Sequence, residues 1–323
     1  MALTTENLVE VPGMASRWVR LASGARAHYM TSGEHGPAVV LLHGGLPGSS
    51  GLAGWRFMAP YLGERGFRVY CPDMPAFGLS DVRPEHWPRG MEDFVDFIDE
   101  FADALCLDRF HLAGNSMGCM NTVNYTVAHP DRVLSFALIA GDIGDVVPED
   151  VKPPQGQFHM TAYDGTREGM RNMMEAIIHR TEAVSDDLVE MRYLSARDRL
   201  EAHRQFWPTL LQYRHLVPWS DQNRAARLAT KGRLDRLDIP GIYLYGRQDI
   251  LTPVEWGYTQ EDHLPHVQFF YPDDCGHQGQ TDRPDLFNPL FHEFFAHGTV
   301  PGELADNAGV SDRRPELPLV KRG

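Results

Sequence analysis

The stretch HLAGNSMGCM, residues 111–120, places one serine between small residues at the end of an apolar run. With its flanks, FHLAGNSMGCMNTVNYTVAHP (residues 110–130), it passes from a strand-like to a helix-like pattern, and residues 114–118 read Gly-x-Ser-x-Gly. This spacing is typical of a nucleophile elbow, a sharp strand-to-helix turn that raises a serine hydroxyl into a pocket. Gly114 and Gly118 suit such a turn because the strand and helix backbones approach closely there. The stretch therefore predicts Ser116 as a nucleophile, and a glycine-rich turn with an incidental serine is the alternative.

Short apolar runs recur along the chain and predict buried strands. They are AVVLLHG from residue 38, RVYCPDM from 68, FHLAGNS from 110, SFALIAG from 135, GIYLYG from 241 and VQFFY from 267. Helical patterns lie between most of them, for example MEDFVDFIDEFADALCL from residue 91, which carries one apolar stripe. The alternation predicts an α/β fold with a mostly parallel sheet, helices on both faces, and ligands beyond the carboxyl ends of the strands.

The alternation of strands and helices stops between residues 145 and 220. Helical tracts around residues 167–180 and 186–213 predict a helical cap there, inserted into a core formed by residues 1–144 and 221–297. Residues 298–323 are polar, rich in Pro and Gly and almost without periodicity. They predict a loosely ordered C-terminal extension.

Composition narrows the class of partner. Across 323 residues, 30 Lys and Arg face 44 Asp and Glu, a net charge of −14 that disfavours nucleic acid and anionic membranes and favours a small-molecule substrate. The start of the chain resembles no signal peptide and no run approaches a membrane span, so a cytoplasmic location is expected. The four cysteines lack metal-ligand spacing and no nucleotide-binding loop occurs, so we expect free buried thiols, no metal and no cofactor. Composition leaves a homo-oligomer open.

A serine nucleophile needs a base that an acid orients. Among fifteen histidines, His277 in PDDCGHQGQ follows the last predicted strand, and Asp249 in YLYGRQD follows the preceding one. The resulting order, serine, aspartate, histidine, is the order found in the fold that carries this elbow. Asp142, which follows SFALIAG, is the alternative acid.

A second glycine-rich tract, VVLLHGGLPGSS at residues 39–50, leaves a strand at His43 and enters a loop. The amide of Gly45 or Leu46 in this loop can face the same point as the amide of Met117, and two such donors stabilise the oxyanion of a tetrahedral intermediate. A phosphate cradle is the alternative for a glycine-rich loop, but its motifs are absent. His43 itself is predicted to be structural.

Together these residues resemble the α/β-hydrolase superfamily over about residues 17–297. The segments GNSMG, DMPAFGLSD, LVEMR and CGHQGQTDRPDLFN are similar to the meta-cleavage product hydrolases of bacterial aromatic and steroid catabolism. The resemblance implies hydrolysis of a carbon–carbon bond in a vinylogous 1,5-diketone made by ring fission, with Ser116, Asp249 and His277 as the triad. It also implies that Arg192 in LVEMR binds the dienoate carboxylate, which matches the fork geometry of a guanidinium.

The chain departs from this family at three positions. Leu46 stands where members usually have a further glycine, Phe57 lies near the place of a polar asparagine, and Gln278 replaces a tryptophan. Asn115, Phe57 and Gln278 are predicted to contact substrate together with Arg192. Ester or lactone hydrolysis by the same triad, and a non-catalytic ligand receptor, are the alternative functions; a solvated cap residue is the alternative role for Arg192.

Overall fold

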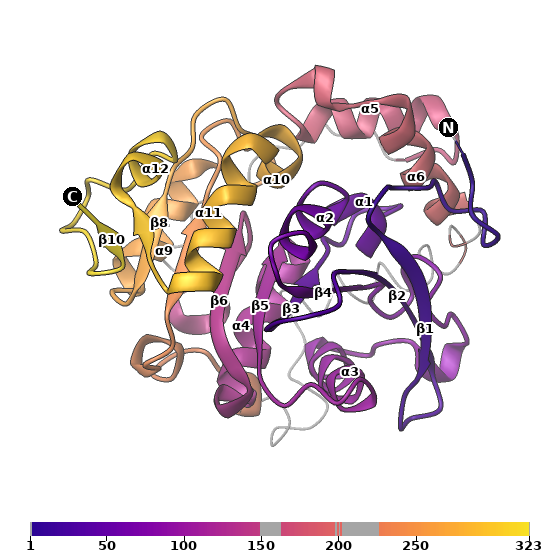
Figure 1. Cartoon of the computed structure of the whole chain (residues 1–323), viewed down its shortest axis with the longest axis horizontal. Coiled ribbons are helices and arrows are strands. Elements are labelled where there is room, and N and C mark those ends of the chain that lie inside the picture. Colours follow the sequence, from indigo (N-terminus) through magenta and orange to yellow (C-terminus); the bar gives the residue numbers. More distant parts are fainter. Residues whose placement is uncertain (1, 149–162, 198, 200, 202–225, 323) are drawn as a thin grey trace.

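An eight-stranded sheet forms the centre of the computed structural model, which describes residues 2–148, 163–197, 199, 201 and 226–322 (Figure 1). The strands are β1 (Ala15–Arg20), β2 (Arg26–Ser32), β3 (Ala38–Leu42), β4 (Arg68–Pro72), β5 (Phe110–Asn115), β6 (Val133–Ile139), β7 (Gly241–Leu244) and β8 (Val267–Phe270). Their order across the sheet is β1-β2-β4-β3-β5-β6-β7-β8. Strand β2 pairs antiparallel with both neighbours, and the pairs from β4 to β8 are parallel. The predicted α/β fold is confirmed.

Alternate residues of each central strand enter two separate cores. Val39 and Leu41 of β3 belong to one core, and Val40 and Leu42 belong to the other. The first core receives side chains of helices α1 (Gly51–Trp55), α2 (Met58–Gly63) and α11 (Pro284–His297). The second receives side chains of α3 (Met91–Ala104), α4 (Met117–Ala128) and α9 (Val254–His263). Burial on both faces explains why these strands read as continuous apolar runs.

Strands β1 and β2 were not among the predicted strands. They form an antiparallel hairpin at the sheet edge, with the register Ala15↔Thr31 through Arg20↔Arg26. In β1 no residue is fully buried, and its sequence ASRWVR mixes polar and apolar side chains. An edge strand that is half exposed does not need the apolar run that identifies a central strand.

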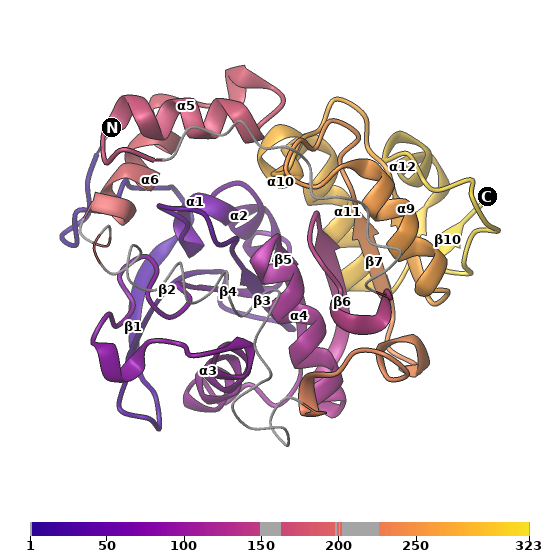
Figure 2. The same cartoon turned by 180° about the vertical axis from the view of Figure 1, so that it is seen from behind.

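Two cap helices, α5 (Arg167–Ile177) and α6 (Asp186–Arg197), lie together on one side of the sheet (Figures 1 and 2). They pack on each other, and α6 also contacts α1. Their apolar faces are buried, with Met170, Met174 and Leu188 fully covered. Because residues 149–162 and 202–225 lie outside the described part of the chain, the cap limits at residues 145 and 220 and a helical tract reaching residue 213 stay predictions.

The segment after His297 differs from the loosely ordered extension that its composition suggested. It contains β9 (Val300–Pro301), α12 (Gly302–Asn307) and β10 (Val320–Lys321), and β10 pairs parallel with β9. Val300, Ala305 and Ala308 are fully buried. The backbone of β8 also bonds this segment, since the amide of Ser311 donates to the carbonyl of Phe269 at 3.0 Å. Isolated apolar residues and backbone hydrogen bonds hold it in place, and neither produces a periodic sequence pattern.

The four cysteines are free, and three of them are buried. Cys106, in the turn after α3, is exposed, which corrects the expectation that all four are buried. Its φ of 54° lies in the left-handed region, as is found in tight turns. Among the described residues, no helix has the length and apolar character needed to cross a bilayer.

Candidate active site

Ser116 occupies a strained turn between β5 and α4. Its φ of 58° and ψ of −117° are rarely adopted by a residue with a side chain. A side chain at position 114 would overlap the carbonyl oxygen of Gly118, and one at position 118 would overlap the carbonyl oxygen of Leu42. The small residues on either side therefore permit the close approach of strand and helix, as the elbow pattern predicts. The Ser116 side chain is held at the carboxyl end of β5, where it remains partly exposed.

Asp249 and His277 meet beyond the ends of β7 and β8. Nδ1 of His277 lies 2.8 Å from Oδ2 of Asp249, and both side chains are buried. The carboxylate also accepts hydrogen bonds from the amides of Leu251 and Thr252, at 2.8 and 3.0 Å, and from the Thr252 hydroxyl at 2.8 Å. These donors fix the carboxylate so that it can hold the imidazole in one orientation and one tautomer.

The alternative acid, Asp142, is used elsewhere. Its Oδ1 accepts a hydrogen bond from the amide of Gly144 at 2.9 Å, within its own loop. The second imidazole nitrogen, Nε2 of His277, is buried and has no hydrogen-bond partner in the described part of the chain. The structure thus joins Asp249, and not Asp142, to the histidine, and leaves Nε2 available to receive a proton.

Asn115 connects the elbow to the histidine loop. Its Nδ2 donates to the carbonyl of His277 at 2.9 Å and to the carbonyl of Ile139 at 3.2 Å. The histidine loop is also bonded to α5, because the amide of His277 donates to the carbonyl of Ile177, the last residue of that helix, at 3.0 Å. The sequence predicted Asn115 as a substrate contact; the structure places its amide group in this internal connection.

The loop after β3 lies against the elbow. A Cβ built on Gly44 would lie 3.4 Å from Cβ of Ser116, Gly45 is buried, and Leu46 is half-buried. Met117 is the first residue of α4, so its amide has no partner within the helix. That these amides converge on one oxyanion stays a prediction.

His43 holds this loop in place, which is the structural role that the sequence suggested. Its Nε2 accepts a hydrogen bond from the amide of Met74 at 2.9 Å, so the proton is on Nδ1. Nδ1 in turn donates to the carbonyl of Gly44 at 2.6 Å. Both ring nitrogens are therefore used by the backbone.

Arg192 lies on α6 and points its side chain at the same loop. Its Nη1 donates to Oγ of Ser49 at 2.9 Å and to the carbonyl of Pro47 at 3.4 Å. The side chain is 1% exposed, so the alternative of a solvated cap residue is wrong. Burial, together with the charge of Arg56, lowers the pKa of Arg192 to about 9. A charge held in this way is poorly solvated and is stabilised by an anion.

The predicted contacts Phe57 and Gln278 have different surroundings. Phe57, between α1 and α2, is 42% exposed, and its ring lies 4.2 Å from the guanidinium carbon of Arg56. Its exposed ring does not support the predicted role as a pocket residue. Gln278 is buried at the start of α10 (Gly279–Asp282), and its Oε1 has no partner among the described residues.

Sequence reasoning missed Arg56, whose side chain is only 6% exposed. The available signal was a single charged residue within the apolar run AGWRFM, residues 53–58. In that run Trp55 and Met58 are both core residues. Arg56 and Phe57 lie in the turn between α1 and α2. There the side chain of Arg56 is buried, whereas the ring of Phe57 is exposed.

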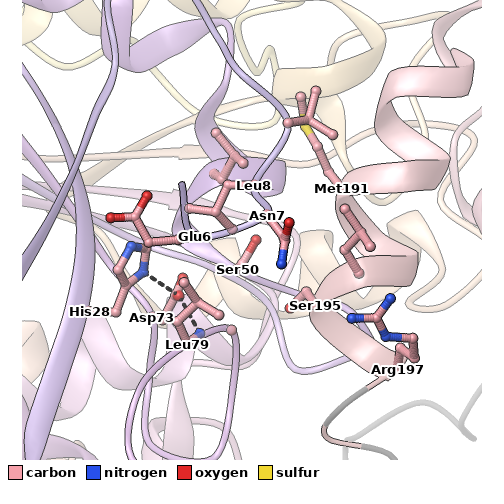
Figure 3. Close-up of a pocket in the computed structure, with 14 residues that line it drawn as sticks. Glu6, Asn7, Leu8, His28, Ser50, Asp73, Leu79, Met191, Ser195 and Arg197 are labelled. Atoms are coloured by element: carbon pink, nitrogen blue, oxygen red, sulfur yellow. Dashed lines mark hydrogen bonds and ion pairs between the residues drawn. The ribbon is translucent and has the colours of Figure 1, made fainter. Parts of the chain in front are cut away.

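A separate pocket lies between the N-terminal segment and α6, and its lining includes none of the three predicted triad residues (Figure 3). His28 and Asp73 form a buried pair at its floor, with Nδ1 and Oδ2 2.7 Å apart. Asp73 also accepts the amide of Gly51, the first residue of α1, at 2.7 Å and that of Leu79 at 2.8 Å. These hydrogen bonds join Asp73, just after β4, to the start of α1, the helix that follows the loop after β3.

Comparison with known proteins agrees with the fold. A family model described as alpha/beta hydrolase fold matches residues 37–284. The chain is 28% identical over 302 residues to a 2-hydroxy-6-oxononadienedioate/2-hydroxy-6-oxononatrienedioate hydrolase of Paraburkholderia phymatum, covering 90% of this chain and 99% of that protein. It is 28% identical to a 2-hydroxy-6-oxo-6-phenylhexa-2,4-dienoate hydrolase of Burkholderia cepacia, covering 85% and 93%. The solved structure of an enzyme of that second name from Rhodococcus sp. strain RHA1 superposes with a TM-score of 0.71 at 27% identity, covering 88% of this chain and 99% of the other.

Proposed function

This chain belongs to the α/β-hydrolase fold family, and we propose that it is a serine hydrolase that cleaves a carbon–carbon bond in a ring-fission product of aromatic catabolism. The observation that carries the proposal is the buried guanidinium of Arg192, bonded to Ser49 of the loop beside the elbow. A neutral ester would leave this charge without an anion, whereas a dienoate supplies one. The substrates named for these two relatives, a dienedioate and a dienoate, both carry such a carboxylate.

In the proposed reaction, the substrate first isomerises from its dienol to the keto form, while Arg192 holds the carboxylate. Ser116, or water activated through it, then attacks the side-chain carbonyl, and His277 accepts the proton at Nε2. Asp249 orients the imidazole and stabilises its charged form. The amides of Gly45 or Leu46 and of Met117 receive the developing oxyanion.

Collapse of the tetrahedral intermediate breaks the carbon–carbon bond, and the electron pair leaves with the dienoate fragment. His277 returns the proton to that fragment. Where Ser116 is the attacking group, an acyl-Ser116 enzyme remains, and a water molecule that His277 deprotonates then hydrolyses it. Overall, water is added across the broken bond and two acids are formed. Neither a metal nor an organic cofactor takes part in this scheme. We propose that residues 145–220 form a helical cap and that the enzyme works in the cytoplasm.

A substrate comparison tests the proposal. The purified protein should consume 2-hydroxy-6-oxo-6-phenylhexa-2,4-dienoate or the nonadienedioate, followed by loss of dienoate absorbance, faster than neutral aryl esters. Ser116→Ala should lower kcat by at least about 10³-fold and change substrate affinity little, because the nucleophile and the binding groups are separate. Turnover of esters or lactones alone would assign the chain to those substrates. Turnover of none, with retained binding, would make it a receptor.

A further inference from the structure

Arg56 and Arg192 are two buried cations whose hydrogen-bond acceptors are all neutral. Nη1 of Arg56 donates to the carbonyl of Ala53 at 3.0 Å and to Oγ1 of Thr281 at 3.4 Å. Among the described residues, Nη1 of Arg192 donates to Oγ of Ser49 and to the carbonyl of Pro47. In the part of the chain that the structure describes, Nη2 of Arg56 and Nε of Arg192 are buried without any acceptor.

The two guanidinium groups come from neighbouring elements of the fold. Helix α1, which ends one residue before Arg56, contacts both α6, the helix of Arg192, and α10. Thr281, which Arg56 reaches, lies on α10, four residues after His277. Burial lowers the pKa of Arg56 to about 10, the exposed Asp187 opposes that effect, and the charge of Arg56 in turn lowers the pKa of Arg192.

Among the described residues, further buried polar atoms on α1 and on the segment from His277 to α10 also lack partners. They are Nε1 of Trp55, Oε1 of Gln278, Oε1 of Gln280 and Nε2 of His277. Buried polar atoms in folded proteins are almost always hydrogen-bonded, to protein or to water. A group of donors and acceptors without partners on α1, α6 and the histidine loop therefore indicates atoms that a ligand satisfies.

The charges define that ligand. Two buried like charges repel each other and each carries a desolvation penalty, so their burial is favourable only when anions accompany them. One carboxylate neutralises one guanidinium and leaves the second unpaired. We propose that Arg56 and Arg192 form a two-cation site that binds a substrate carrying two negative charges. This inference rests on the proposed function and assigns Arg56 a part in substrate selection.

Two chemical sources can supply the second negative charge. One is a second carboxylate, as in the nonadienedioate named for one relative. The other is the 2-hydroxyl group beside the carboxylate, ionised to an enolate, which the 6-phenyl dienoate named for another relative also has. In either case the substrate has two anionic groups, one for each guanidinium.

The first experiment is independent of carbon–carbon cleavage. The rate of hydrolysis of 4-nitrophenyl acetate, a neutral ester, is measured with three added inhibitors. They are malonate, a compact dianion, glutarate, an extended dianion, and the monoanion butyrate. At least one dianion should inhibit at about 10-fold lower concentration than butyrate, by analogy with a charge-assisted hydrogen bond added to the same ligand. Arg56→Gln should abolish the preference and Arg56→Lys should restore part of it, whereas Arg65→Gln, which removes an exposed cation on the outer surface, should leave it intact.

The outcomes separate the two proposals. If neither dianion is preferred by the unmodified protein, or if a folded Arg56→Gln protein keeps the preference, the two-cation site is refuted. If the preference exists but no dienoate is consumed, the site stands and the proposed reaction is wrong. Where dienoates are consumed, the kcat/KM of Arg56→Gln identifies the group that Arg56 binds. A loss confined to the nonadienedioate identifies the second carboxylate. An equal loss on the 6-phenyl dienoate identifies the enolate.

Discussion

Gly48 faces the backbone carbonyl of Arg192 so closely that a methyl group at position 48 would overlap the carbonyl oxygen. Its φ of 76° is in addition a conformation that favours glycine. The loop that follows β3 and the cap helix α6 are thus in direct backbone contact. The same loop supplies Ser49, whose hydroxyl oxygen accepts a hydrogen bond from the guanidinium of Arg192. Contacts of Gly48 and Ser49 with α6 therefore fix both the loop after β3 and the side chain of Arg192.

We predict that Gly48→Ala destabilises the protein and lowers kcat/KM. The substitution must both strain the backbone and push α6 away from the loop. Gly24→Ala is the matched control, because Gly24 has a φ of 85° and no atom lies within 4 Å of a Cβ built there. The control should cost about 1–2 kcal/mol from the left-handed backbone alone and leave kcat/KM unchanged. Equal losses of stability in urea unfolding, with equal activity, would show that the contact does not matter.

The second prediction compares two aspartates. Asp249→Asn should lower kcat by about 10³- to 10⁴-fold, because an amide cannot stabilise the charged imidazole and favours the wrong tautomer. Asp142→Asn should lower it less than about 10-fold, since Asp142 accepts from its own loop and not from His277. Steady-state rates with a dienoate and with an aryl ester measure both. A larger loss in Asp142→Asn would reassign the acid.

Much of the core, the elbow turn and the pairing of Asp249 with His277 could be predicted because the information is local. The elbow needs small residues within one turn, and central strands buried on both faces need unbroken apolar runs. Ser116, Asp249 and His277 each follow such a run, so the positions of the runs indicated which histidine and which aspartate end at the same sheet edge. The parallel sheet then brings the chain segments together.

The features that were missed depend on contacts between distant segments. Arg56 is buried because α6 and α10 pack on α1, and no local pattern shows that an arginine after Trp55 enters the core. Phe57, one residue further, leaves it. The C-terminal segment is fixed by single residues that bond to β8 and α9, which a search for periodicity does not detect.

The third prediction concerns that C-terminal segment. Arg314 donates to the carbonyl of Leu264 at 2.8 Å and to that of Val267, and its Nε lies 3.3 Å from the buried carboxylate of Glu261. Arg314→Ala should cost about 2–3 kcal/mol in unfolding free energy, because it leaves buried acceptors without donors. Arg322→Ala, which removes exposed ion pairs with Asp306 and Glu316, should change the unfolding free energy much less, because water screens exposed ion pairs. Chemical denaturation of both variants would show whether the segment is integral to the fold.

The fourth prediction is a dependence of stability on pH. Burial raises the pKa of Asp73, but the charges of His28 and His43 and the hydrogen bonds from His28 and the Leu79 amide outweigh it and hold the pKa below its ordinary value. The folded state therefore disfavours protonation of Asp73. Its contribution to stability is complete above the unfolded pKa of about 3.9 and is lost as the pH falls through the lower folded pKa.

Asp73→Asn should accordingly lower Tm at pH 7, and the difference in Tm from the unmodified protein should shrink as the pH falls below about 4. Asp108→Asn, at an exposed position between α3 and β5, serves as the control and should show a small difference. Thermal unfolding across pH 2–7 gives both curves. A difference for Asp73→Asn that stays constant with pH would mean that folding does not lower the pKa of Asp73.

The last prediction tests whether Arg192 recognises a carboxylate. Its guanidinium is buried against the loop after β3, and its Nε has no partner among the described residues. A substrate carboxylate should gain a charge-assisted bond there worth about 1.5–3 kcal/mol. Arg192→Ala should thus lower kcat/KM for a dienoate by about 10- to 10²-fold. A neutral aryl ester should lose far less, because it makes no such bond. Arg171→Ala, on the outer face of α5 and paired with Asp186, controls for cap stability and should change neither substrate. Equal losses on charged and neutral substrates would give Arg192 a purely structural role and remove the main support for a dienoate over an ester.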